Sequence, residues 1–275
     1  MKYRRQTIGV LLLVCMLGGV TTTLWAEQDH VQIQEQLDKG RTIIEEAEQR
    51  AEFDAEQTIL TMTLHYANGK QRTRHLEIFT KYDEDGNRKN LIRFTGPNDV
   101  KNTALLTLEG EKGNDDQWLY LPILRKSKRI AAGAKTRSFA GTDYTFEDLR
   151  PEALDRHDYL YTEDQEIDGQ PCFVILATPT PEEEPYTGYG KRLIFIRQDN
   201  YFPIETRYYD KNETLLKKYT HAELINIGGK TWRADTSVME NVQEKTKTVR
   251  VVDERLLPDT LDDMLFTQHE LTREY

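Results

Sequence analysis

The chain has 275 residues, a formal net charge of −10 and only two cysteines. Such acidity argues against binding nucleic acid, because affinity for nucleic acid comes from neutralised phosphates, and against general adhesion to anionic lipid. The length is sufficient for one domain that rests on its own hydrophobic core.

The first 26 residues have the composition of an export signal. Three bases precede an almost wholly apolar run at residues 8–20, which is too short to span a bilayer comfortably. A small residue, Ala26, ends the segment, so we expect cleavage after it and export to the periplasm. Cleavage would leave a net charge of −13 and one cysteine, Cys172. The alternatives are an uncleaved anchor, or a lipid on Cys15 inside the apolar run.

An amphipathic helix is predicted at residues 31–52. Apolar or small residues recur every three or four positions on one face, and the opposite face is charged. Gly40 in the middle weakens the helix by about 1 kcal/mol relative to Ala, so packing must hold it in place. It could be a lid across a barrel mouth or an ordinary helix on a sheet. The apolar face consists of Ile33, Leu37, Gly40, Ile44, Ala47 and Ala51.

Beyond this helix the hydrophobic period changes to two, which indicates an antiparallel sheet with one polar face. Apolar and polar residues alternate over residues 60–66, and Asn68-Gly69 is a strong hairpin signal. A similar meander resumes over residues 159–252. Since no βαβ rhythm, repeat or domain boundary is visible, residues 27–275 are predicted to form one domain.

The most distinctive pattern lies in residues 117–149. A strand-like run ends at Pro122, and six bases without an acid follow in this acidic chain. Acid returns afterwards, and Thr145 followed by Asp148 is typical of a helix start, so we expect a helix near residues 145–156. The bases are Arg125, Lys126, Lys128, Arg129, Lys135 and Arg137.

Two interpretations of this basic block remain open. In the first, bases at the rim of the sheet meet a phosphate head group or an acidic partner, and the candidates are Arg125, Lys126, Lys128 and Arg129. In the second, the bases pair internally and hold the following loop and helix, through Asp143, Glu147 and Asp148.

No catalytic or metal-binding constellation can be assembled from the sequence. The histidines stand alone without metal-ligand spacing. Cys172 lies in an apolar strand without an electropositive neighbour, as expected of a buried, inert cysteine. Glu147 and Asp148 are adjacent, which in a helix points their side chains apart. We therefore expect no enzymatic activity, no cofactor and no metal.

Several motifs form a specific set, although none is specific alone. They are Trp118-Leu119-Tyr120-Leu121-Pro122, Arg129-Ile130, Phe139, Gly141, Asp143, Glu147-Asp148-Leu149, Ile92-Arg93-Phe94 with Pro97, Asp168-Gly169-Gln170-Pro171-Cys172, Lys191-Arg192, Tyr208-Tyr209-Asp210 and Met239-Glu240-Asn241. As a set they resemble the LolA-like outer-membrane lipoprotein-sorting proteins, over nearly all of the chain after residue 30. The resemblance implies an α+β fold, mainly antiparallel β: a half-open, unclosed β-barrel with helices covering its concave face.

The resemblance also implies a function. The first candidate is a periplasmic carrier, which we expect to be a monomer, that binds acyl chains of a lipid or lipoprotein in an apolar concave face. The second is a non-enzymatic accessory subunit that docks on an RND-type inner-membrane exporter. A large apolar cavity would favour the carrier, and a well-packed concave face would favour docking. Strand alternation gives the candidate lipid-binding positions, although register between strands is not readable: Leu60, Met62, Leu64, Ile78, Leu106, Leu108, Trp118 and Tyr120.

Overall fold

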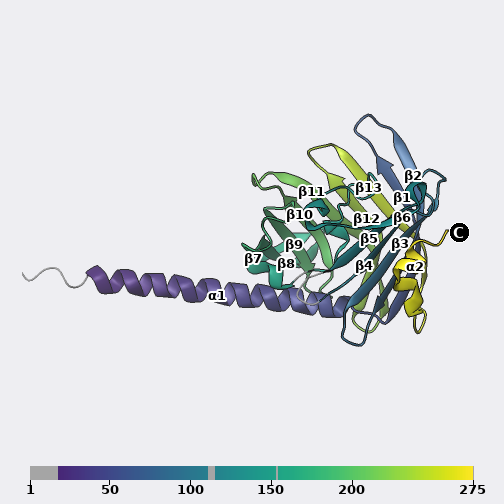
Figure 1. Ribbon diagram of the computed structural model, residues 1–275. Coiled ribbons are helices and arrows are strands. Elements are labelled where there is room, and N and C mark those ends of the chain that lie inside the picture. The colour runs from purple at the N-terminus through teal and green to yellow at the C-terminus, as the bar shows by residue number, and fades with distance from the viewer. Residues whose placement is uncertain (1–17, 111–114, 153, 275) are drawn as a thin grey trace, which may run out of the picture.

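Thirteen antiparallel strands form one curved sheet in the computed structural model, which describes residues 18–110, 115–152 and 154–274 (Figure 1). The sheet order is β6-β5-β4-β3-β2-β1-β13-β12-β11-β10-β9-β8-β7, so β6 and β7 are its two edges and the barrel is unclosed. The strands are β1 Ala55–His65, β2 Gln71–Tyr82, β3 Arg88–Gly96, β4 Ala104–Leu108, β5 Asp116–Leu121, β6 Lys126–Arg129, β7 His157–Ile167, β8 Gln170–Pro179, β9 Lys191–Arg197, β10 Pro203–Tyr209, β11 Leu215–Gly228, β12 Thr231–Asn241 and β13 Thr246–Leu256. The predicted fold class is confirmed.

Local turn chemistry explains the meander. The predicted Asn68-Gly69 hairpin joins β1 to β2, and Gly69 takes a φ of +80° that favours glycine. Asp168-Gly169 joins β7 to β8 with φ angles of 50° and 77°. The one long-range pairing in the middle of the sheet is that of β1 with β13, which joins the two ends of the strand series.

The helix α1 covers Gly18–Ala51 and packs its C-terminal half on the concave side of β7 to β9, while its other half projects beyond the sheet (Figure 1). Ile43 and Ile44 are buried there against Tyr159 of β7. Gly40 permits this contact, because a Cβ at that position would lie 2.3 Å from the carbonyl oxygen of Tyr159. Gly40 is therefore required by packing.

Two details of this helix differ from the sequence prediction. It already includes Gly18, the first described residue, so the expected cleavage site after Ala26 lies within the helix of the uncleaved chain, and residues 1–17 lie outside the described residues. Ile33 is 53% exposed, because the sheet contacts the helix only further along. Signal-peptide cleavage stays a prediction.

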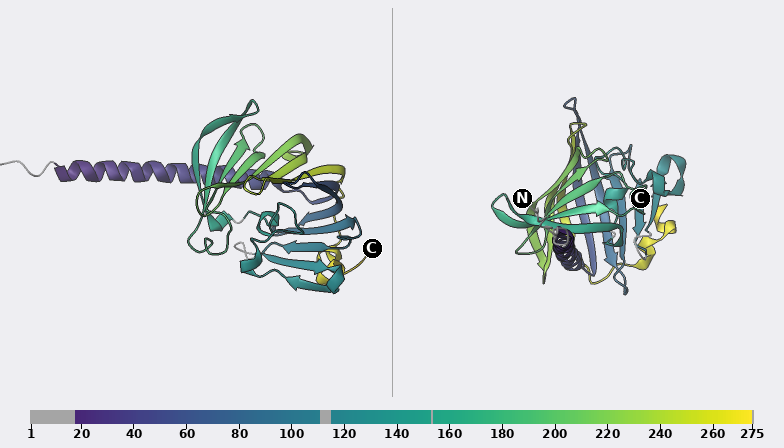
Figure 2. Two further views of the ribbon diagram at one scale, coloured as in Figure 1. Left: turned by 90° about the horizontal axis from the view of Figure 1, so that it is seen from above. Right: turned by 90° about the vertical axis from the view of Figure 1, so that its left-hand side faces the viewer.

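The sheet has a hydrophobic core on each face. The concave core contains Leu60, Leu76 and Phe94, together with side chains from the β6–β7 connection. On the convex face, the C-terminal turns η6 (Asp263–Phe266) and α2 (Gln268–Leu271) cover Leu106 and its neighbours. Figure 2 shows the sheet curving past the end of α1, with the C-terminal segment on the other side.

The prediction of a helix near residues 145–156 is wrong. Its place is taken by two short 3₁₀ turns, η4 (Glu147–Leu149) and η5 (Leu154–Arg156). Pro151 explains the break, because the residue before a proline avoids the helical conformation. Arg150 is indeed extended, with φ −96° and ψ 158°. Two further 3₁₀ turns, η2 (Pro122–Leu124) and η3 (Ala132–Ala134), flank β6.

Candidate functional site

Residues 130–149, here called the plug, leave β6 and cross the concave face of the sheet. Phe139 and Phe146 insert into the concave core. The ring of Phe139 lies 5.6 Å from that of Phe94 on β3 and 5.8 Å from that of Phe146, between centroids. The plug is therefore held to the sheet by aromatic packing, and Phe139 of the sequence motif is one of its anchors.

A tight bend lets the plug enter the concavity. Ser138 and Thr145 form an isolated antiparallel bridge, and the chain turns between them. Ala140 and Gly141 have φ angles of 51° and 73°, a region that favours glycine at the second position. Arg74 of β2 donates to the carbonyl oxygen of Ala140 at the tip. Gly141 of the motif is thus needed by the backbone.

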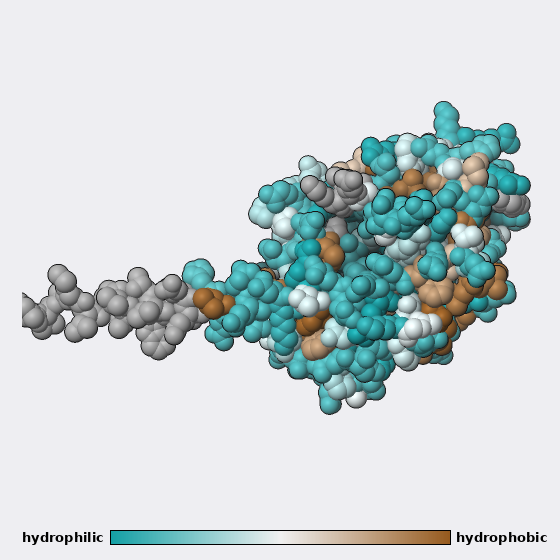
Figure 3. All heavy atoms as spheres, turned by 90° about the horizontal axis from the view of Figure 1, so that it is seen from below, coloured by the Kyte–Doolittle hydropathy of each residue, from teal (hydrophilic) through white to brown (hydrophobic). Residues whose placement is uncertain are grey.

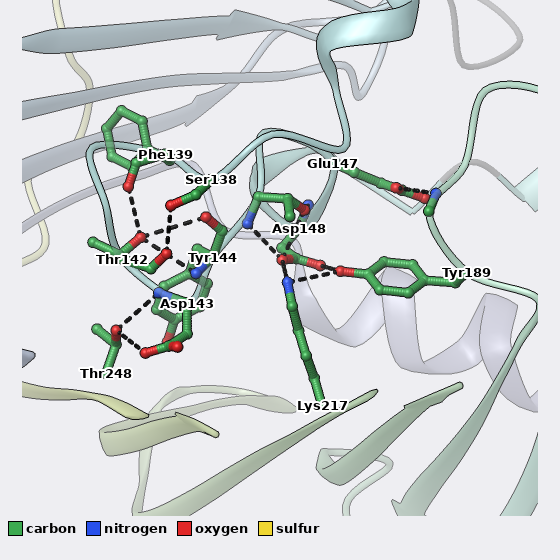
Figure 4. A network of polar contacts seen from close by, with 12 residues as sticks. Ser138, Phe139, Thr142, Asp143, Tyr144, Glu147, Asp148, Tyr189, Lys217 and Thr248 are labelled. Carbon is green, nitrogen blue, oxygen red and sulfur yellow. Dashed lines mark hydrogen bonds and ion pairs between the residues drawn. The ribbon is translucent and has the colours of Figure 1, made fainter. Parts of the chain in front are cut away.

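Asp143 ties the tip of the plug to β13. Its carboxylate accepts hydrogen bonds from the hydroxyls of Thr246 and Thr248, the latter at 2.6 Å (Figure 4). Its backbone N–H donates back to Thr248 Oγ1 at 3.0 Å.

Asp148 is the centre of a buried polar network at the base of the plug (Figure 4). Its Oδ2 pairs with Lys217 Nζ of β11 at 2.9 Å, and its Oδ1 accepts from Tyr189 OH at 2.6 Å. Thr145 donates its N–H and its hydroxyl to the same carboxylate at 2.7 and 2.8 Å. The side chains of Asp148 and Lys217 are 1% and 5% exposed. Burial and the charge of Asp148 raise the pKa of Tyr189 well above its usual range, so it stays a hydrogen-bond donor.

Glu147 fixes the plug to the loop between β8 and β9. Its carboxylate accepts from the hydroxyl of Thr187 and from the backbone N–H of Gly188, the latter at 2.9 Å. Burial raises the pKa of Glu147. Thr145 and Asp148 do contact each other, because the Thr145 hydroxyl accepts from the backbone N–H of Asp148 at 3.3 Å, but the element that follows is a single 3₁₀ turn whose N-cap position is Phe146 and has no side-chain cap.

The predicted internal pairing of the basic block with Asp143, Glu147 and Asp148 is wrong. These acids bind the distant partners described above, and the ion pair found for the block joins Arg129 to Asp116. Four of the six bases instead lie in residues 122–129, here called the basic hairpin, which end with the sheet's edge strand β6. Lys135 and Arg137 lie in the plug. The four bases of the basic hairpin are exposed, and so are two apolar residues, Ile123 (91%) and Leu124 (60%).

The eight predicted lipid-binding positions do not form one surface. Four lie on the concave side: Leu60, Met62, Leu64 and Ile78. The other four lie on the convex side under the C-terminal turns: Leu106, Leu108, Trp118 and Tyr120. The strand register determines which side each position faces. Ile92 pairs with Leu105, so Leu105 points into the concavity and Leu106, the next residue, points to the convex side. That half of the prediction is wrong.

A cavity of about 370 Å³ lies in the concavity between the end of α1, the plug and the sheet. Ile78, which is the one predicted position among its lining residues, contributes with Ile92 to an apolar part of the wall, and Leu149 of the plug and Val252 of β13 add to it. Leu60, Met62 and Leu64 pack directly against the plug. The cavity is within the range of small-molecule sites.

The rest of the wall includes charged side chains, among which six bases outnumber three acids, and sequence reasoning missed them. Glu56 pairs with Arg233 at 2.8 Å and with Arg255, which also contacts Asp235 at 2.7 Å. Arg250 of β13 also lines the cavity. The available signal was strand alternation, which places a base at an inward position. The charged lining residues are Arg50, Glu56, Arg88, Asp148, Lys230, Arg233, Asp235, Arg250 and Arg255.

A second buried ion cluster lies beneath α1. Arg192 of β9 donates two hydrogen bonds to Glu152, at 2.6 and 2.8 Å. Burial alone would raise the pKa of Glu152, but Arg192 lowers it to about 2. Burial, together with the charge of Glu152, raises the pKa of Glu48 on α1 to about 7.

Other site types find no support in the part of the chain that the structure describes. There, no group of three or more His, Cys, Asp and Glu residues could hold a metal ion. Between residues 18 and 274, apart from the gaps noted above, no helix is both long and apolar enough to cross a membrane. Figure 3 shows a face dominated by hydrophilic residues, on which hydrophobic ones emerge in separate patches.

The unclosed antiparallel barrel with few helices matches the open-barrel fold of LolA-like proteins. A domain of Vibrio parahaemolyticus, named as a candidate outer membrane lipoprotein-sorting protein, is 30% identical, with 86% of this chain and 100% of that one covered and a TM-score of 0.81. A DUF1329 family protein from Desulfovibrio piger is 26% identical, covering 86% and 99%, with a TM-score of 0.79. A LolA superfamily protein from Nitrosomonas europaea shares the fold at 18% identity, covering 84% and 98%, with a TM-score of 0.64.

The family model that matches residues 86–273 carries the description "Uncharacterized protein". No curated protein sequence matches the chain. The chain belongs to the outer-membrane lipoprotein-sorting proteins.

Proposed function

We propose that this protein is a periplasmic, non-enzymatic carrier that shelters acyl chains of a lipid or lipoprotein between its sheet, α1 and the plug. The observation that carries the proposal is the cavity of about 370 Å³, whose apolar part continues into the concave core. Each Å² of apolar surface removed from water contributes about 25 cal/mol, so such a face can hold a lipid without covalent chemistry.

The plug and α1 are the movable covers in this proposal. Leu60, Met62 and Leu64 already have apolar neighbours in Phe139 and Phe146, so a full acyl chain must displace the plug to reach them. The plug is attached chiefly through side chains, at Asp143, Glu147 and Asp148, and these contacts can break without unpairing the sheet. The cavity next to Leu149 is the entry point.

A cavity-filling substitution tests the carrier. Native mass spectrometry of the protein extracted from its own periplasm should show co-purified lipid. Val252 lines the cavity, whereas its neighbour Val251 is 40% exposed on the opposite face. Val252→Trp should therefore lose the lipid, and Val251→Trp should keep it. A wild-type protein without lipid, or a Val252→Trp variant loaded as fully as the wild type, would refute the carrier.

The basic hairpin favours a second candidate function, docking on an RND-type inner-membrane exporter. An edge strand offers unpaired backbone groups to a partner, and exposed Ile123 and Leu124 beside four bases suit an acidic surface with an apolar centre. Replacing Ile123 and Leu124 with Ser should abolish co-purification with the exporter and leave lipid loading unchanged. Intact co-purification would exclude the hairpin as the docking site.

A further inference from the structure

The cavity concentrates buried nitrogen atoms that have no hydrogen-bond partner among the described residues. Nine buried side-chain polar atoms among the described residues lack a hydrogen-bond partner, and five of them belong to residues that line this one cavity. All five are nitrogens. They are Arg88 Nε, Asn200 Nδ2, His221 Nδ1, Arg250 Nε and Arg255 Nε. Because an unsatisfied buried donor costs about 1–3 kcal/mol, such a concentration indicates a ligand that accepts hydrogen bonds.

The charges of the cavity also indicate a ligand that accepts hydrogen bonds, and Arg250 is the residue that carries this argument. Of the other arginines that line the cavity, Arg50 pairs with Glu46. Arg233 pairs with Glu56, and Arg255 pairs with Glu56 and Asp235. Arg88 interacts electrostatically with the carboxylates of Glu48 and Glu109. Arg250 lies 5.7 Å from the ring centroid of Tyr144, and its other electrostatic neighbour is Tyr219. Both are phenols and not carboxylic acids, and Arg250 forms no ion pair with a carboxylate of the described residues.

His221 supports the assignment as a neutral donor or acceptor beside the cation. Its ring packs against Tyr219 at 4.2 Å and Phe202 at 5.3 Å, between centroids. Burial and the charge of Arg250 lower the pKa of His221 to about 3, so it adds no second positive charge at neutral pH. The Arg250 guanidinium is therefore the charged group, with His221 and Asn200 as nearby polar contacts.

We propose that the cavity binds the oxyanion of an amphiphile, a carboxylate or a phosphate, with Arg250 as its principal contact and the apolar wall at Ile78 and Ile92 holding the start of the chain. The guanidinium fork matches both oxyanions. This inference rests on the proposed carrier function and specifies its ligand as anionic. It also accounts for a retained buried charge, which costs stability when it is left unpaired.

A pair of probes that differ in charge and by a single methyl group tests the inference. Binding of a fluorescent long-chain fatty acid and of its methyl ester is measured by titration of the purified full chain. The wild type should bind the acid at least about tenfold more tightly than the ester, a difference of about 1.4 kcal/mol. Arg250→Gln should lower acid affinity to that of the ester and leave ester affinity unchanged, while Arg250→Lys should restore part of the preference.

Arg233→Gln is the matched control, because it removes a cation from the same cavity whose charge Glu56 already balances. It should keep the preference for the acid. Equal wild-type affinity for acid and ester, or an acid preference that survives in Arg250→Gln, would overturn the anion site and leave the carrier standing.

Inorganic phosphate separates the remaining outcomes. If phosphate displaces the fatty acid from the wild type and does not displace the ester, the oxyanion itself is recognised. If neither probe binds, the carrier function fails, and the anion site is then judged by phosphate alone. In that case phosphate should raise the melting temperature of the wild type and not of Arg250→Gln, and equal shifts would refute the site. Without ligand, the melting temperature of Arg250→Gln should be no lower than that of the wild type. If Arg250 instead stabilised the fold, its replacement would lower the melting temperature.

Discussion

Removing the charge of Lys217 should release the plug. Lys217→Met keeps the aliphatic stem of the side chain but leaves the carboxylate of Asp148, 1% exposed, without its counter-ion. Breaking a buried ion pair from one side costs about 3–5 kcal/mol. Since Thr145 and Tyr189 still donate three hydrogen bonds to Asp148, we expect the lower end, about 3 kcal/mol. For a chain of this length that corresponds to a melting temperature lower by roughly 6–12 °C.

The double variant Asp148→Asn with Lys217→Met should lose less stability than the sum of the two single variants, because neither charge is then left alone. Lys191→Met is the control: in its pair with Glu213, at 3.1 Å, the side chains are 31% and 76% exposed, so the pair is expected to contribute less than about 1 kcal/mol. Denaturant unfolding measures the loss, and hydrogen exchange of residues 137–149 locates it. The reasoning fails if Lys217→Met costs no more than the control, or if plug amides exchange at the wild-type rate.

Three further predictions follow from other parts of the molecule. Gly40→Ala should destabilise the fold by about 1–3 kcal/mol in denaturant titration, because its Cβ would meet the backbone of Tyr159. The control Gly133→Ala, which has open space around it, should leave stability unchanged. A stabilising effect of Gly40→Ala would contradict the packing argument. Because the pKa of Glu48 is raised to about 7 in the folded state from 4.5, its contribution to stability is present below about pH 4.5 and is lost as the pH rises through 7. Glu48→Gln should flatten the stability profile in that window, and an unchanged slope would exclude the assignment. Replacing the four bases of the basic hairpin with Gln should slow transfer to a partner, or loading from an anionic membrane, most strongly at low salt. The affinity for a bare acyl chain should hardly change. A large decrease in melting temperature with normal transfer would show that these bases stabilise the fold instead.

Local patterns were enough to predict the strands and their hairpins. Alternation over residues 60–66 and the Asn68-Gly69 turn are local properties of the chain, and both appear in the structure as expected. The end of the first helix was also readable, because an amphipathic stripe depends only on nearby residues. The set of motifs identified the family for the same reason: each motif is a short run of residues.

The amino-acid sequence by itself determined the antiparallel class and the positions of the turns, since both depend on residues that are near neighbours in the chain. It also determined the family, since each motif of the set is a short run of residues. Only the tertiary structure decided which side of each strand faces the cavity, and a register that directs Leu105 inward sends Leu106 to the opposite face. It also decided the partners of Asp148 and Arg250. Lys217 is 69 residues from Asp148, and an arginine without a carboxylate looks the same in a sequence as a paired one. Period-two alternation states that two faces differ, but long-range packing determines which face encloses a ligand.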